Sequence, residues 1–158
     1  MGESYQLAAM QQALATARRG QYAGEPPVGA CLVHDGEVIA VAHTGVVAGP
    51  DATAHAEMLA LRAGCQHLRT ARLADCELFV TVEPCAMCLA AACYAGITRI
   101  YFGAPLESLD QITGAELRGP VPGYLQVSGG LLAAESELLL REWADARGAQ
   151  SSRQSPMR

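Results

Sequence analysis

The sequence predicts an α/β domain in which helices cover both faces of a five-stranded mixed sheet. Apolar stretches of strand length alternate with segments of helical periodicity along most of the chain. The pair Asp35-Gly36 joins the first two apolar stretches, which is typical of an antiparallel hairpin. The chain has 158 residues, 51% of them hydrophobic, which suffices for one domain with a core. We therefore expect one domain over residues 1–150 and a disordered tail over residues 151–158.

The first half of the chain is expected to fold as helix, hairpin and helix. Apolar residues three and four apart, from Leu7 to Ala17, indicate an amphipathic helix over residues 5–19. Residues 28–33 and 38–42 are the predicted strands of the hairpin. A glycine-rich loop over residues 44–51 follows them. Thr53 can cap the next helix, which we expect Gly64 to end.

The second half alternates strands and helices. We expect a buried strand over residues 77–82, an alanine-rich helix over 85–95 that Gly96 ends, and a fourth strand over 99–103. Glycines and prolines interrupt residues 106–122, which leaves open whether one irregular helix forms within a loop there. A short strand over 125–127 and a long helix over 131–147 complete the prediction. Because helices separate the later strands, these strands should be parallel to one another.

Composition narrows the classes of function. The formal net charge is −5, and all 11 basic residues are arginine. An acidic chain without basic runs is poorly suited to non-specific binding of nucleic acid or anionic membranes, although a local arginine patch can hold one specific nucleic acid. No apolar run reaches the about 18 residues of a membrane span, and residues 1–19 lack the features of a secretory signal. We expect a cytoplasmic protein with no membrane partner, whose six cysteines are buried or bind metal.

Two cysteines, Cys85 and Cys88, stand where a predicted strand gives way to a helix. Their spacing in a helical turn places both sulfur atoms on one face, where they can bind one metal ion. The first turn of a helix also carries unpaired N–H groups and the positive end of the helix dipole, which favour thiolate. Two thiolates and one imidazole suit tetrahedral zinc with one position left for water. Such an open position is typical of catalytic zinc.

His55 and Glu57 stand at the start of another predicted helix. Side chains two apart on a helix point to nearly opposite sides, so we expect His55 to bind the metal and Glu57 to lie beside the bound water. Zinc lowers the pKa of such a water towards ~7, and a nearby carboxylate can take its proton and deliver it elsewhere. This division of roles makes Glu57 the candidate catalytic residue.

Less specific interpretations of these motifs stay open. A Cys-x-x-Cys pair can be a redox pair, half of a closed structural zinc site, or two core cysteines. A closed site would take its fourth ligand from His34, His43, His67 or another cysteine. The remaining cysteines lie in apolar stretches, and we expect them to be small core residues: Cys31, Cys65, Cys76 and Cys93. The number of ligands alone does not exclude the closed site.

Taken together, the motifs resemble the cytidine/deoxycytidylate deaminase superfamily, whose zinc enzymes share the signature H-x-E…P-C-x-x-C. The resemblance extends from about residue 27 to residue 103. It is closest to the branch that contains tRNA adenosine deaminases, bacterial guanine deaminases and fungal cytosine deaminase. Three stretches carry it: Pro27-Val28-Gly29-Ala30, Asp51-Ala52-Thr53-Ala54-His55-Ala56-Glu57 and Thr81-Val82-Glu83-Pro84-Cys85.

The resemblance implies a three-layer α/β/α domain, a homodimer and hydrolytic deamination. It implies that His55, Cys85 and Cys88 hold Zn²⁺. Glu57 would take a proton from the zinc-bound water, protonate the ring nitrogen of the substrate and then protonate the departing amine. The backbones of Ala56 and Cys85 would lie near the reacting centre.

One position departs from that pattern. In this branch an asparagine in the loop after the second strand commonly hydrogen-bonds the substrate, but Thr44 takes its place here. The chain contains no asparagine that another alignment could supply. Threonine offers a hydroxyl but not the paired donor and acceptor of an amide. Both a substrate contact by Thr44 and a solvated loop threonine stay open.

Two further differences bear on the substrate. The tRNA enzymes of the branch carry a Gly-Ala-Ala-Gly-Ser-like segment after the fourth strand and a basic last helix. Residues 109–116 lack that segment here, and the acidic last helix would repel a phosphate backbone. We therefore expect a small nucleobase, nucleoside or related heterocycle, guanine-like first and cytosine-like next. Asp110 or Glu107 can accept a hydrogen bond from its exocyclic amine, as acidic residues of this region do in guanine deaminases, or these acidic residues can be solvated.

Two alternative functions remain. A tRNA-specific adenosine deaminase would use the same chemistry, and a basic groove beside the zinc would support it. A non-catalytic structural zinc domain would show four protein ligands on the metal or a blocked cavity. If the protein deaminates a small heterocycle, the walls of the substrate cavity would come from residues 106–122 together with four single residues: His43, Thr44, Glu83 and Met87.

Overall fold

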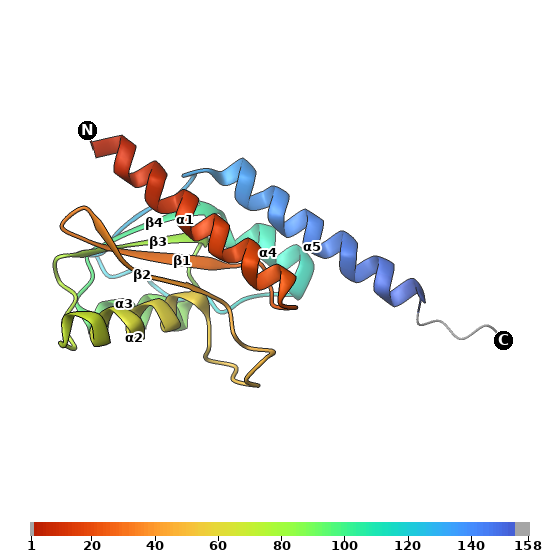
Figure 1. Cartoon of the computed structure of the whole chain (residues 1–158), viewed down its shortest axis with the longest axis horizontal. Coiled ribbons are helices and arrows are strands. Elements are labelled where there is room, and N and C mark those ends of the chain that lie inside the picture. The colour runs from red at the N-terminus through yellow and green to blue at the C-terminus, as the bar shows by residue number, and fades with distance from the viewer. Residues whose placement is uncertain (1, 154–158) are drawn as a thin grey trace.

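The computed structural model describes residues 2–153, which form five helices and one five-stranded sheet (Figure 1). The predicted alternation of strands and helices is confirmed. The elements are, in chain order, α1 (Gly2–Tyr22), β1 (Gly29–His34), β2 (Glu37–His43), α2 (Ala56–Leu68), β3 (Cys76–Val82), α3 (Ala86–Ala95), β4 (Arg99–Ala104), α4 (Leu106–Thr113), β5 (Gln126–Ser128) and α5 (Ala133–Arg153).

The sheet is mixed, as expected, with the strand order β2-β1-β3-β4-β5. Strand β1 runs antiparallel to both of its neighbours, whereas β3, β4 and β5 are parallel. Asp35 and Gly36 close the β1–β2 hairpin with φ angles of 50° and 79°. Two successive residues with positive φ are typical of a type I′ turn, which matches the twist of the strands. The hairpin predicted from this pair is therefore present.

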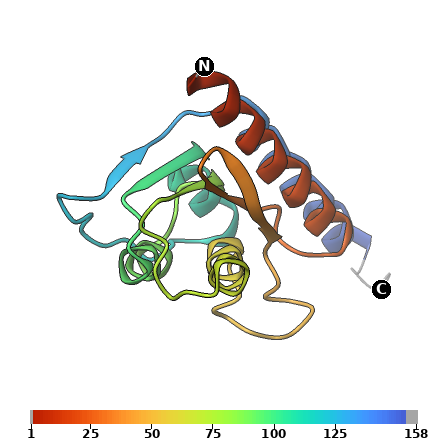
Figure 2. The ribbon, with the colours of Figure 1, turned by 60° about the vertical axis from the view of Figure 1, so that its left-hand side comes forward.

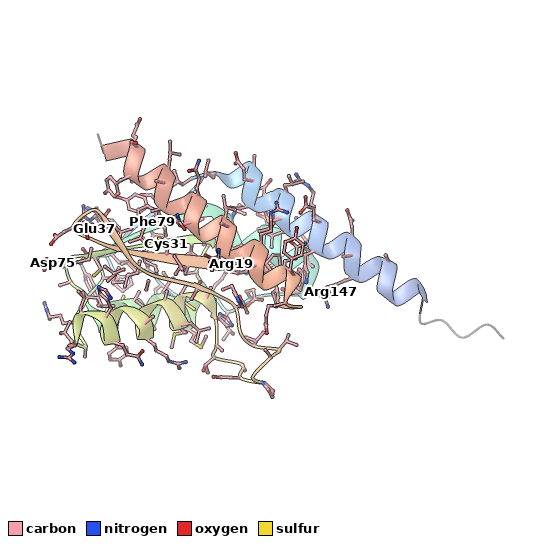
Figure 3. All side chains as sticks on the ribbon, viewed as in Figure 1. Arg19, Cys31, Glu37, Asp75, Phe79 and Arg147 are labelled. Carbon is pink, nitrogen blue, oxygen red and sulfur yellow. The ribbon has the colours of Figure 1, made fainter. Side chains whose placement is uncertain are left out.

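Helices cover both faces of the sheet. Figure 2 shows α2 and α3 nearly end-on beneath the sheet, with α1 and α5 on its opposite side. The larger core lies between the sheet and the α2–α3 layer, and a second core lies under α1. Cys31 and Phe79 belong to this second core (Figure 3), where the Phe79 ring stacks on Tyr101 at 4.8 Å. The three-layer α/β/α arrangement implied by the sequence is confirmed.

The ends of α2 differ from the prediction. The helix begins after His55 instead of after Thr53, whose N–H is bound by the Asp51 side chain. It also continues past Gly64 to Leu68, and Arg69 caps it with a left-handed φ of 54°. Gly64 is buried against Leu32, and a Cβ at Gly64 would lie 2.2 Å from a Leu32 methyl carbon. This glycine permits close packing of α2 on the sheet, and it does not end the helix.

The later elements follow the prediction with shifted bounds. The open stretch over residues 106–122 contains one regular helix, α4, followed by an irregular segment. Helix α5 extends to Arg153 and so includes the first residues of the expected tail. Residues 154–158 lie outside the described part of the chain, so the prediction of a disordered tail is not tested for them.

Two other sequence expectations concern cysteines and membranes. All six cysteines are free thiols, and Cys31 and Cys76 are buried core residues, whereas Cys65 and Cys93 are partly exposed. Within residues 2–153, every helix is too short or too polar to cross a bilayer.

We predict that Gly29→Ala destabilises the fold, because Gly29 lets α1 approach β1 closely. A Cβ at Gly29 would lie 2.1 Å from the Ala13 carbonyl oxygen and 2.7 Å from the Ala17 nitrogen, both backbone atoms. Overpacking of this kind should lower the free energy of unfolding by about 2 kcal/mol or more. Urea denaturation measures the loss. The control is Gly49→Ala, where a Cβ would have no atom within 4 Å, and equal stability of the two variants would contradict the prediction.

Candidate metal centre

The candidate site lies where α2 and α3 begin, beneath one end of the sheet. His55 is the N-cap residue of α2 and Cys85 is the N-cap residue of α3, with extended backbones at both positions. Neither side chain caps its helix by a hydrogen bond, so both are free to turn towards each other. Cys88 follows in the first turn of α3. Two helix N-termini thus bring together residues that lie 30 positions apart.

These three side chains form a compact set of donors. The His55 Nδ1 atom lies 3.6 Å from the Cys85 sulfur and 3.5 Å from the Cys88 sulfur. Two donors bonded to one tetrahedral zinc, at about 2.1 Å for nitrogen and about 2.3 Å for sulfur, are about 3.6 Å apart. Cys88 is fully buried and Cys85 nearly so. The spacing and the chemistry of these donors therefore fit Zn²⁺.

The closed structural zinc site lacks a fourth ligand in the described part of the chain. Among residues 2–153 the metal-binding group comprises His55, Cys85 and Cys88. The histidines proposed as a fourth ligand lie elsewhere: the His43 ring bonds the Thr44 carbonyl, and His34 lies near Asp35. Three protein ligands leave one tetrahedral position for water, which is the arrangement of catalytic zinc.

The electrostatics of the thiols reflect their closeness. A hydrogen bond with Cys88, followed in importance by the one with His55, lowers the pKa of Cys85 to about 4. Cys88 is the partner that keeps its proton in this bond, and its pKa is raised. The hydrogen bond with Cys85 also raises the pKa of His55. A bound cation would hold both sulfur atoms as thiolates.

Glu57 lies in the first turn of α2, and only 4% of its surface is exposed. Burial raises the pKa of its carboxyl to about 7. A carboxyl group whose pKa is close to neutrality can both accept and donate a proton under cellular conditions. Glu57 also faces the same cavity as His55 and Cys85. It thus has the position and the proton affinity of a general acid–base.

The cavity has a volume of about 160 Å³. Pockets that hold drug-sized ligands have about 300–1,000 Å³, so this cavity suits one small ring system. Its walls come from the α1–β1 connection, the β2–α2 loop, the end of β3 and the α4 region. They comprise Pro26, Val28, Thr44, Val46, His55, Glu57, Val82, Glu83, Cys85, Leu106, Leu109, Thr113 and Glu116.

The three residues expected to contact substrate lie in different places. Thr44 is buried in the cavity wall, and its hydroxyl donates a long hydrogen bond of 3.4 Å to the Val28 carbonyl. Ala56 is fully buried and does not line the cavity. Asp110 does not line it either, because its carboxylate pairs with Arg118 and accepts the Glu116 N–H at 2.7 Å. The substrate contacts of these residues stay predictions.

Other wall residues were only partly foreseen. Glu83 lines the cavity as expected, whereas His43 and Met87 do not. The stretch over residues 106–122 also lines the cavity as expected, through Leu106, Leu109, Thr113 and Glu116, although the sequence did not single out these four residues. Pro26 and Val46 come from two connections and belong to none of the predicted motifs. What brings them to the cavity is tertiary structure, not a sequence pattern.

The zinc-binding region of the cytidine and deoxycytidylate deaminases is the family whose model matches residues 3–104. This match covers more than half of the chain, so the chain belongs to that family. The family, the fold and the donor set together define a zinc-dependent hydrolytic deaminase. The resemblance and the zinc cofactor expected from the sequence are therefore confirmed.

Known proteins of two substrate types are similar to this chain. It is 46% identical over 104 residues to a tRNA-specific adenosine deaminase of Aquifex aeolicus, across 66% of this chain and 67% of the relative. A guanine deaminase structure from Nitrosomonas europaea superposes with a TM-score of 0.79 at 29% identity, covering 88% of this chain and 84% of the other. A structure from a study of A-to-I editing by tRNA:A34 deaminases superposes with a TM-score of 0.70 at 36% identity, covering 84% and 99%.

We predict that zinc protects Cys85 from iodoacetamide. In chelator-treated protein, Cys85 should react faster than Cys31, because burial raises the pKa of Cys31 to about 12 and leaves it fully covered. Added zinc should slow alkylation of Cys85 about tenfold or more, because a metal-bound thiolate is a poor nucleophile. Peptide mass spectrometry measures each site. Partly exposed Cys65 is the control, and equal labelling of Cys85 with and without zinc would contradict the metal assignment.

Proposed function

We propose that the protein deaminates a small aminated heterocycle, guanine-like first and cytosine-like next, and releases ammonia. The observation that carries this proposal is the cavity beside the donor set, whose walls include three glutamates and no arginine. Carboxylates accept hydrogen bonds from amino and ring N–H groups, and they repel phosphate. Similarity to a guanine deaminase structure supports the same substrate class.

In the proposed mechanism, His55, Cys85 and Cys88 would hold zinc, which would lower the pKa of water so that hydroxide is available near neutral pH. Glu57 takes a proton from the attacking water and gives it to the ring nitrogen next to the amino-bearing carbon. A carbon–oxygen bond forms, and the carbon–nitrogen bond to the amino group then breaks. Glu57 then takes the proton of the newly formed hydroxyl group and delivers it to the departing amine, so that a carbonyl group forms, one water is consumed and one ammonia is released.

Glu116 is the proposed acceptor for the far edge of the substrate. It lines the cavity, and one of its carboxylate oxygens accepts the Thr113 hydroxyl at 3.1 Å. Its backbone N–H is bound by Asp110, which Arg118 anchors in turn. Its remaining acceptor capacity suits an exocyclic amine, the contact that the sequence analysis assigned to Asp110. We propose that Asp110 does not contact the substrate itself but holds the backbone of Glu116 in place.

A second candidate function is deamination of adenosine in tRNA. It is favoured by the 46% identity to a tRNA-specific adenosine deaminase. A flipped-out base would also fit the cavity. Against it stands the composition of α5, in which four acidic residues outnumber three arginines, so that the helix offers no basic surface to a phosphate backbone.

A substrate panel distinguishes the two functions. Zinc-loaded protein is incubated with guanine, 2,6-diaminopurine, cytosine, adenine, their nucleosides, aminopterins and an anticodon stem–loop. Ammonia release reports on the free compounds, and inosine in the digested RNA reports on the stem–loop. We expect release from a free heterocycle and no inosine. Inosine in the stem–loop, without release from any free compound, would establish the tRNA function instead.

We predict that Glu57→Gln keeps its zinc but loses turnover. Glutamine matches the shape of glutamate but cannot carry a proton between water and substrate, so kcat should fall about 10²-fold or more. Metal analysis should still find one zinc per chain. Exposed Glu37 on β2 offers the control variant Glu37→Gln, which should behave as wild type. Full activity of Glu57→Gln would exclude the proposed mechanism.

The homodimer expected from the resemblance stays a proposal. It is supported by the outer face of α3, where Tyr94 is 94% exposed beside a groove of about 480 Å³ that Tyr124 and Pro122 also line. Large exposed aromatic side chains around a hollow are typical of protein contacts. Light scattering tests this proposal by the mass of the particle in solution. The cytoplasmic location stays a prediction too.

A further inference from the structure

Glu25 is a buried carboxylate outside the metal centre. It lies in the connection between α1 and β1, and 1% of its surface is exposed. Its oxygens accept three hydrogen-bond contacts from the β2–α2 loop: two from the Val47 N–H at 3.1 Å and one from the Ala48 N–H at 2.7 Å. Salt bridges of the described chain do not include it. Because a buried carboxylate is costly unless hydrogen bonds replace its water, these contacts hold the loop firmly.

The carboxylate joins two walls of the substrate cavity. Pro26 and Val28, just after Glu25, line one side of the cavity. Thr44 and Val46, just before the two bound amides, line another. The Thr44 N–H is bonded directly to the Val28 carbonyl at 3.1 Å, so the hydrogen bonds of Glu25 act on the next part of the wall, at Val46. They set how far this part of the β2–α2 loop stands from the α1–β1 connection. That separation is the width of the cavity at this point.

The metal-binding end of the same loop is held by other contacts. The Gly45 N–H donates to the Ala54 carbonyl at 2.9 Å, which ties the two ends of the loop together. The Asp51 side chain accepts the Thr53 N–H at 2.8 Å, two residues before His55. His55 thus keeps its own support when Glu25 is changed. Loss of the Glu25 contacts should alter the substrate wall and leave the metal ligands in place.

From this arrangement we infer that Glu25 is a positioning residue, which holds the wall formed by Val46 at the distance that the substrate requires. The inference rests on the proposed deamination in this cavity. It assigns Glu25 to substrate binding and not to the chemical step. Its variants should therefore raise KM far more than they lower kcat.

The test compares Glu25→Gln with a matched control in the zinc-loaded full chain. Glutamine has the same shape, but an NH2 group replaces the carboxylate oxygen that accepts only the Val47 N–H, and the charge that strengthens the remaining bonds is lost. We expect KM to rise about tenfold or more, kcat to stay within about threefold, and zinc to remain at one per chain. The control is Glu77→Gln. Glu77 is also buried, but it lies at the end of β3 that is far from the cavity, where it accepts the Tyr5 hydroxyl at 2.8 Å. The KM of the Glu77→Gln variant should therefore stay within about twofold of the wild-type value.

Hydrogen exchange supplies a readout that does not depend on substrate. Peptides covering residues 44–54 should exchange about tenfold faster in Glu25→Gln and at the wild-type rate in Glu77→Gln. If the glutamine variant does not fold, Glu25→Asp keeps both oxygens on a side chain one methylene shorter. It should show a smaller change in the same direction in KM and in loop exchange.

Three results would overturn the inference: unchanged KM with unchanged loop exchange, equal KM changes in the Glu25 and Glu77 variants, or loss of zinc with a matching fall in kcat. If the wild-type protein deaminates none of the tested substrates, the proposed function fails by itself. The exchange comparison then still decides whether Glu25 holds the wall: faster exchange of residues 44–54 supports it, and an unchanged rate overturns it.

Discussion

The convergence of one imidazole and two thiols is the constraint on which the rest of the structure depends. His55 and the two cysteines approach within about 3.6 Å because α2 and α3 begin side by side on one face of the sheet. Donors held this closely are unfavourable together until a cation shares them. The sheet therefore has to be rigid where β3 passes into α3, and β3 is buried along its whole length. Zinc binding and folding should stabilise each other.

The site has a second recurring feature: side-chain carboxylates accept hydrogen bonds from backbone N–H groups. Glu25 binds two amides of the β2–α2 loop, Glu83 binds the N–H of Leu106 at the start of α4, and Asp110 binds the N–H of Glu116. Each bond fixes an irregular segment that lines the cavity. Charge-assisted bonds of this kind are stronger than those between neutral groups. Some of the acidic residues of the chain thus stabilise the walls of the cavity.

The metal centre and the alternation of elements could be predicted because their signals are local. Cys85 and Cys88 share one helical turn, and Asp35-Gly36 defines its hairpin without reference to the rest of the chain. Gly64 misled the prediction because its role is tertiary: it faces Leu32 across the core instead of ending a helix. The surroundings of Asp110 could not be predicted for the same reason. Only the ion pair of Asp110 with Arg118 shows that its carboxylate is occupied elsewhere.

Separate supports for the metal and for the walls allow the substrate to change while the chemistry is kept. The metal ligands stand on helix N-termini that pack against the sheet, whereas the walls come from connections tied by single carboxylates. A substitution such as threonine at position 44 alters a wall without moving His55, because the loop ends are tied independently. This separation is consistent with similarity to both tRNA adenosine and guanine deaminases. The connecting segments that form the walls then determine which substrate binds. In such segments the sequence pattern gives the least information about structure.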